Sequence, residues 1–138
     1  MAADAARGAD TRGCWLRRAA ADLRGADVDL MAAPPLIGDA VFHCQQAAEK
    51  ALKAFLAWHD LPFRKTHDLG EIGQQCIALD RSLEPLCRSA EGLTTFAWIF
   101  RYPGELEEPP VEDAVSALAL ARDVDNAVLS RLPGDLRP

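Results

Sequence analysis

The sequence has few of the residues on which most catalytic centres depend. It contains three histidines and one tyrosine, and no histidine follows His67. It has no phosphate-binding glycine loop, no dinucleotide fingerprint and no nucleophile elbow. The histidines do not form a zinc pattern with a helical pair four residues apart. These absences argue against the corresponding enzyme classes, and we expect neither a metal nor a cofactor.

Paired cysteines and long apolar runs are also missing. The four cysteines are spaced too widely for a zinc knuckle or a CxxC redox pair. Each lies within an apolar helical pattern, which favours buried thiols in a reducing cytoplasm. No run approaches the length of a membrane span, and the first ten residues lack the apolar core of a secretory signal. We therefore expect a cytoplasmic protein with no membrane segment.

The chain has no excess of positive charge. Its formal net charge is -6, which argues against broad, sequence-independent binding to nucleic acid. Residues 1–68 are electrically balanced, so the negative excess falls on residues 69–138. All three lysines lie in the first half. An anion site is therefore expected to draw its cations from the first half of the chain.

Alanine and leucine are abundant and β-branched residues are scarce, which favours helices over strands. The apolar residues recur at helical spacing. Prolines separate the helical patterns, where they do no damage. The patterns predict five helices: about Thr11–Met31, about Leu36–His59, one from Thr66 or His67, about Leu83–Phe100, and one after Pro110. Short connections predict an all-α, antiparallel up-and-down bundle. We expect residues 1–10 to be disordered, 11–132 to form the bundle and 133–138 to be frayed.

The most informative segment is Phe42–Leu56, a helix pattern in which polar residues form one stripe. His43, Gln46, Lys50 and Lys53 are spaced by three, four and three residues, which places them on one side of a helix. The stripe is a candidate ligand-binding surface. Structural roles remain open: hydrogen bonds between helices for His43 and Gln46, and a solvated face for the lysines, with a Glu49–Lys53 pair.

Three further positions are candidates. Thr66 suits a helix cap and Asp68 suits the positive end of a helix dipole, but neither capping nor periodicity explains His67. Arg101 at a helix C-terminus complements the dipole or binds a phosphate. Tyr102 packs against the bundle or stacks on a base.

The segment Phe42–Leu56 resembles the signature of the HEPN family (higher eukaryote and prokaryote nucleotide-binding domains). Three shorter pieces fit in order: Trp15-Leu-Arg-Arg18 with Asp22-Leu23, Lys65-Thr-His-Asp-Leu69, and Arg101-Tyr-Pro103. The resemblance covers about residues 11–131. It implies an antiparallel helical bundle that forms a homodimer. It also implies a minimal nucleotidyltransferase as protein partner, as in toxin–antitoxin pairs.

Other members of that family are metal-independent endoribonucleases, whose chemistry uses an arginine followed after four to six residues by a histidine. Arg101 lies in the corresponding region, but the histidine positions hold Leu106, Glu107 and Glu108. This departure favours a non-catalytic binding or regulatory protein, which is our first hypothesis. One alternative is a divergent endoribonuclease that uses Arg101 with His43 or His67. The other is a nucleotide-binding module, in which the stripe, Arg101 and Tyr102 line a pocket for a nucleotide or RNA.

Overall fold

The computed structural model describes residues 2–63, 65–100 and 107–138, with side chains described from residue 13 onward within these ranges. The elements are α1 (Ala2–Met31), α2 (Ile37–Trp58), α3 (Leu69–Leu79), η1 (Arg81–Leu83), α4 (Glu84–Ala90), α5 (Leu93–Ile99), α6 (Val111–Leu129) and η2 (Gly134–Leu136). These ranges contain no strand, so the all-α prediction is confirmed. None of the described helices combines the length and apolarity that crossing a membrane requires.

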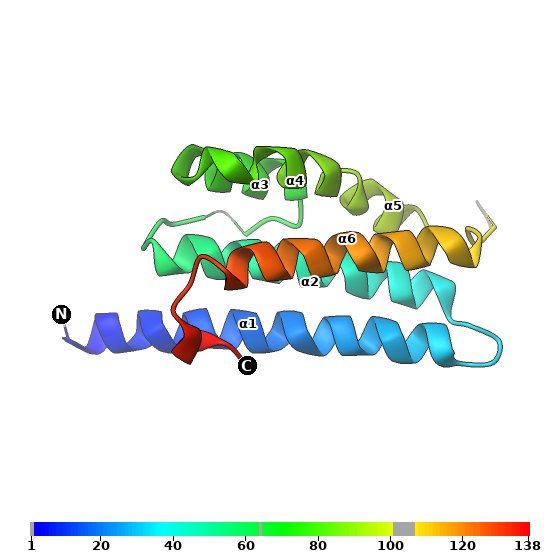
Figure 1. Ribbon diagram of the computed structural model, residues 1–138, viewed down its shortest axis with the longest axis horizontal. Coiled ribbons are helices and arrows are strands. Elements are labelled where there is room, and N and C mark those ends of the chain that lie inside the picture. Colours follow the sequence, from blue (N-terminus) through cyan, green and yellow to red (C-terminus); the bar gives the residue numbers. More distant parts are fainter. Residues whose placement is uncertain (1, 64, 101–106) are drawn as a thin grey trace.

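The direction of the chain alternates along the bundle from α1 to α2, then through α4 and α5, to α6 (Figure 1). α1 and α2 lie side by side and run in opposite directions, and α6 runs the same way as α2 (Figure 1). The helices α4 and α5, which we call the α4–α5 arm (residues 84–99), carry the chain back along the bundle before α6 begins (Figure 1). This alternation is the up-and-down arrangement that short connections favour.

α2 is the central element, in contact with α1, α3, α5 and α6. Helical periodicity predicts that one face of α2 is turned to the core, and all five residues of that face are buried: Val41, Cys44, Ala48, Leu52 and Phe55. Further α2 alanines are buried as well, namely Ala40, Ala47, Ala51 and Ala54. Alanine stabilises a helix without losing side-chain entropy, and its small size lets neighbouring helices approach closely. α2 is therefore buried on more than one face.

Several predicted boundaries differ from the structure. α1 begins at Ala2 rather than near Thr11. The predicted fourth helix is divided at Glu91 and Gly92 between α4 and α5, and glycine is a weak helix former. Pro85 occupies the first turn of α4, as expected. The tail expected to fray contains η2, whose Leu136 packs against the core.

α3 begins at Leu69, not at Thr66 or His67. The cap is the Asp68 carboxylate, which accepts a hydrogen bond from the Gly70 backbone N–H at 3.0 Å. The Thr66 hydroxyl instead accepts from the Asp68 backbone N–H at 3.1 Å and orders the turn before the helix. Short polar side chains commonly bond to the backbone two residues on, which explains both contacts.

One side-chain prediction for α6 was wrong. Helical periodicity predicts that Val115, Leu118, Ala121 and Val128 share the apolar stripe, but 54% of the surface of Val115 is exposed. The other three are buried, and Ala114 takes the place of Val115 on the buried face of α6. Val115 is next to Ala114 in sequence, and one residue rotates the side chain about 100° around a helix.

The expectation of buried thiols is confirmed for three of the four cysteines, while Cys14 is half-buried. Burial raises the pKa of Cys44 to about 12 and that of Cys87 to about 11. Burial also raises the pKa of Cys76. Because the thiolate is the reactive form, these three side chains serve as small apolar core residues.

An ion pair joins Asp80, the residue between α3 and η1, to Arg131, which follows the end of α6. The Arg131 Nε donates to Asp80 Oδ2 at 2.7 Å, and its Nη2 donates to the Ser82 hydroxyl at 2.7 Å. Hydrogen bonds from the Ser82 hydroxyl, from Arg131 and from the Ser82 backbone N–H lower the pKa of Asp80 from 3.8 to about 2. The carboxylate form is therefore favoured in the folded protein.

We expect this interaction to stabilise the fold at neutral and mildly acidic pH. The folded-state pKa lies below the unfolded value, so the stabilisation is present above about pH 4 and is lost as pH falls toward 2. The Asp80→Asn variant should melt below the wild type at pH 6, with the difference shrinking toward pH 2. Thermal unfolding followed by circular dichroism measures this. Asp123→Asn, at an exposed position on α6, is the control, and a pH-independent Asp80→Asn effect would contradict the prediction.

Candidate functional site

The polar stripe of α2 is turned toward the rest of the molecule rather than toward bulk solvent. His43 and Lys50 contact Asp22 of α1. Lys53 contacts Glu49 one turn earlier on α2 and is only 6% exposed. The stripe therefore separates into two groups of charges. We call them the Asp22 cluster (Asp22, Asp29, His43, Lys50) and the Glu49 cluster (Gln45, Gln46, Glu49, Lys53, His67).

The Asp22 cluster holds α1 against α2. The His43 Nδ1 lies 2.9 Å from Asp22 Oδ1, and the Lys50 Nζ donates to Asp22 Oδ2 at 2.5 Å. The His43 Nε2 lies 3.7 Å from Asp29 Oδ2, which is beyond hydrogen-bond range. Burial raises the pKa of Asp29, the nearby His43 lowers it, and Asp39 raises it. Both Lys50 and the ring of His43 therefore already have a carboxylate partner.

Gly25 of α1 makes room for the His43 ring. A Cβ atom at this position would lie 3.2 Å from the imidazole carbon and nitrogen atoms, which is tighter than ordinary packing. The ring is thus enclosed by α1 and bonded to it. This arrangement supports the structural alternative for His43, a histidine that joins two helices.

The Glu49 cluster surrounds a carboxylate that is only 2% exposed. Glu49 Oε1 lies 2.9 Å from His67 Nδ1 and accepts from Gln45 Nε2 at 3.2 Å. Glu49 Oε2 accepts from Lys53 Nζ at 3.1 Å. Removing a charge from water is costly unless donors replace the lost hydration. The predicted Glu49–Lys53 pair therefore exists, but it is buried and does not belong to a solvated face.

The backbone of His67 is fixed from two sides. Its carbonyl oxygen accepts from Gln45 Nε2 at 3.0 Å and from the Thr94 hydroxyl of α5 at 3.4 Å. The Leu69 backbone N–H donates to the same Thr94 oxygen at 3.0 Å. The His67 ring nevertheless stays 62% exposed. The backbone of His67 is thus held in place, while much of its ring is open to solvent.

A pocket of about 470 Å³ adjoins the Glu49 cluster. It lies between α1, α2 and the described residues 61–63 and 65–68 before α3. Its lining residues are Trp15, Lys53, Phe63, Lys65, Thr66 and His67. The Trp15 and Phe63 rings meet edge to face with centroids 6.1 Å apart. The Lys53 Nζ lies 5.4 Å from the Trp15 ring centroid and 5.7 Å from that of Phe63. Aromatic walls and cations therefore meet in one place.

Hydrogen-bond donors dominate the lining of this pocket. Lys53 and Lys65 contribute ammonium groups, and His67 presents its second ring nitrogen, which is a donor only when the ring is protonated. The Trp15 Nε1–H is buried and has no hydrogen-bond partner among the residues that the structure describes. The nearby carboxylate of Glu49 already accepts from Gln45 and Lys53. A ligand with several acceptor oxygens and negative charge matches this arrangement. In the part of the chain that the structure describes, no group of three metal-ligating side chains exists.

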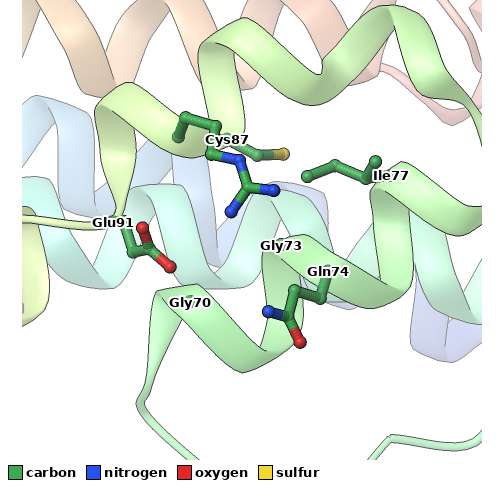
Figure 2. A pocket seen from close by; sticks show the side chains of 7 residues that line it. Gly70, Gly73, Gln74, Ile77, Cys87 and Glu91 are labelled. Atoms are coloured by element: carbon green, nitrogen blue, oxygen red, sulfur yellow. The ribbon is translucent and has the colours of Figure 1, made fainter.

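Two other hollows offer less. Figure 2 shows the gap between α3 and α4, where the Glu91 side chain points toward Gly70. This gap has no space for a water-sized sphere. A Cβ at Gly73 would lie 3.2 Å from the Cys87 Cβ, so this gap is a close helix contact. A hollow of about 500 Å³ lies on α1, where Arg24 is the one cation of its lining.

The structure brings together only part of the predicted site. Lys53 and His67 line the same pocket, whereas His43 and Lys50 belong to the Asp22 cluster. Gln46 donates to Gln45 Oε1 at 2.7 Å and supports the Glu49 cluster. Arg101 and Tyr102 lie outside the described residues.

Sequence reasoning missed several members of the pocket. Trp15 and Phe63 were not predicted to line it, and Lys65 was noted only as part of a motif. The signal for Glu49 was available: a carboxylate within a helix otherwise rich in Ala, Leu and Phe needs partners when that helix is buried. Nothing local in the sequence indicates that Phe63 meets Trp15, because the two belong to distant segments.

Comparison with known proteins gives one result. A family model described as HEPN domain matches residues 14–131. No curated protein and no solved structure matches the chain. The matched range contains both clusters and every residue that lines the 470 Å³ pocket.

We predict that Asp22→Asn destabilises the fold. The change leaves Lys50 without its carboxylate partner in a largely buried position, and breaking such a pair costs about 2–4 kcal/mol of unfolding free energy. Urea unfolding measures the loss. The control is Asp27→Asn, which breaks the exposed pair with Arg122 and should cost less than about 1 kcal/mol. Equal effects of the two variants would show that the Asp22 cluster has no special role.

Proposed function

Because the chain belongs to the HEPN domain family, we propose that it is a non-catalytic regulatory module that binds a phosphate-bearing nucleotide. The ligand would occupy the pocket formed by Trp15, Lys53, Phe63, Lys65, Thr66 and His67. This proposal keeps the nucleotide-binding alternative but places the nucleotide in this pocket rather than along the polar stripe of α2. The pocket uses only Lys53 and His67 of the residues first considered.

The observation that carries the proposal is the surplus of donors beside aromatic rings. Phosphate oxygens accept strong hydrogen bonds from ammonium groups and imidazolium. Trp15 and Phe63 offer ring surface to a planar base, since base–aromatic stacking accepts any base. The volume of about 470 Å³ falls within the range typical of small-molecule sites. Within the described residues, Lys65 has no ion-pair partner and is free to meet an anion.

The non-catalytic part of the proposal rests on the sequence after Arg101. Leu106, Glu107 and Glu108 occupy the positions where ribonucleases of this family carry histidine. A regulatory module then needs a protein partner, and we propose a minimal nucleotidyltransferase together with self-association into a homodimer. Light scattering of the purified protein tests the dimer. Co-purification with the product of a neighbouring nucleotidyltransferase gene tests the partner.

A second candidate function is metal-independent RNA cleavage. It is favoured by one observation: a buried carboxylate, Glu49, lies 2.9 Å from the Nδ1 of an exposed histidine, His67. A histidine oriented in this way can take a proton from a ribose hydroxyl within hydrogen-bond range. RNA cleavage in EDTA by the wild type, His67→Gln and Arg101→Ala decides the question. Absence of cleavage by the wild type removes this candidate.

We expect calorimetry to detect binding of AMP, ATP, GMP or GTP, and Lys65→Ala to weaken it. A hydrogen bond to a charged group contributes about 1.5–3 kcal/mol, so affinity should fall roughly tenfold or more. Arg81→Ala removes the same charge from the exposed Arg81 in η1, and its affinity should match that of the wild type. No binding at millimolar nucleotide would refute the proposed function.

A further inference from the structure

We infer that anion binding in this pocket is coupled to the uptake of one proton by His67, with Glu49 as the positioning residue beneath it. The inference rests on the proposed function and adds its regulation. It says that the site is filled more readily as the medium becomes more acidic. It also says that the site distinguishes anions from neutral ligands of the same shape.

The geometry assigns different tasks to the two ring nitrogens. Nδ1 lies 2.9 Å from Glu49 Oε1, and an ionised carboxylate only accepts hydrogen bonds, so Nδ1 carries a proton. In a neutral imidazole the other nitrogen, Nε2, is then an acceptor. An acceptor in the pocket repels a phosphate oxygen. Once Nε2 is protonated it becomes a donor, and the same oxygen is attracted.

The charges around His67 explain why the proton should arrive with the ligand. From α2, the Glu49 carboxylate favours an imidazolium, whereas the Lys53 ammonium opposes it. From the preceding segment, Lys65 also opposes it. Asp68 follows in the chain, and its carboxylate caps α3. α5 contributes Trp98, whose ring centroid lies 5.9 Å from that of His67, and has no charged residue. An incoming anion offsets both lysines, so the balance shifts toward protonation.

Glu49 has a purpose here beyond its ion pair with Lys53. It is almost fully buried and bonded on both oxygens, so it holds a fixed position under the ring. A fixed carboxylate keeps Nε2 as the exposed nitrogen and supplies the counter-charge when the ring is protonated. Thermodynamic linkage then works in both directions: the anion promotes protonation, and protonation promotes anion binding.

The test measures proton uptake directly. Calorimetric titrations with sodium sulfate and with AMP are run at about pH 7.5 in two buffers of different ionisation enthalpy. Sulfate does not titrate in this range, so any proton taken up on its binding belongs to the protein. The wild type should take up a substantial fraction of one proton per anion. Its affinity for sulfate should rise by up to about tenfold for each pH unit between about pH 8 and about pH 6.

Two variants locate the proton. His67→Gln keeps a side chain that can donate a hydrogen bond to Glu49, so the fold should be retained. Its proton uptake and pH dependence should both vanish while weak anion binding persists. His59→Gln, at an exposed histidine that packs on Phe55, is the matched control and should behave as the wild type. Binding without proton uptake, or uptake that survives in His67→Gln, overturns this inference alone. Absence of AMP binding both at about pH 6 and at about pH 8 overturns the proposed function and this inference with it.

Discussion

The buried carboxylate of Glu49 is the interaction on which the rest of this structure depends. It lies in the middle of α2 and is bonded by side chains of the same helix and of the segment before α3. Lys53 and His67 are thereby drawn to one place, and the backbone of His67 is fixed beside them. A buried carboxylate requires hydrogen-bond donors, which an apolar core cannot provide, and two of the donors around Glu49 also line the pocket.

The two clusters divide the polar residues of α2 by purpose. In the Asp22 cluster, Lys50 and the ring of His43 are paired with carboxylates of α1, so they hold the two helices together. In the Glu49 cluster a single carboxylate serves both Lys53 and His67, and both remain at the wall of a pocket. The local ratio of nitrogen-bearing side chains to carboxylates therefore separates the residues that join helices from those that line the pocket.

The fold was predictable to a large extent, because helical periodicity and proline placement are local properties of a sequence. The core face of α2, from Val41 to Phe55, followed from periodicity alone. The outward orientation of Val115 did not, since it depends on how α6 is rotated against its neighbours. The break at Gly92 was also missed, although glycine is a local signal for it. The site was predictable only as a stripe. The division of its residues between Asp22 and Glu49 depends on which residues of α1, and which of residues 65–68, come close to α2.

The hydrogen bonds of Thr94 connect the pocket to the outer layer of the molecule. α2 is covered by four helices, so its amide hydrogens exchange with solvent only when most of the bundle opens. The α4–α5 arm is peripheral and interrupted at Gly92, so it can open at lower free energy. Thr94 lies on that arm and binds both the His67 carbonyl and the Leu69 amide. Opening of the arm therefore frees one wall of the pocket while the core stays closed.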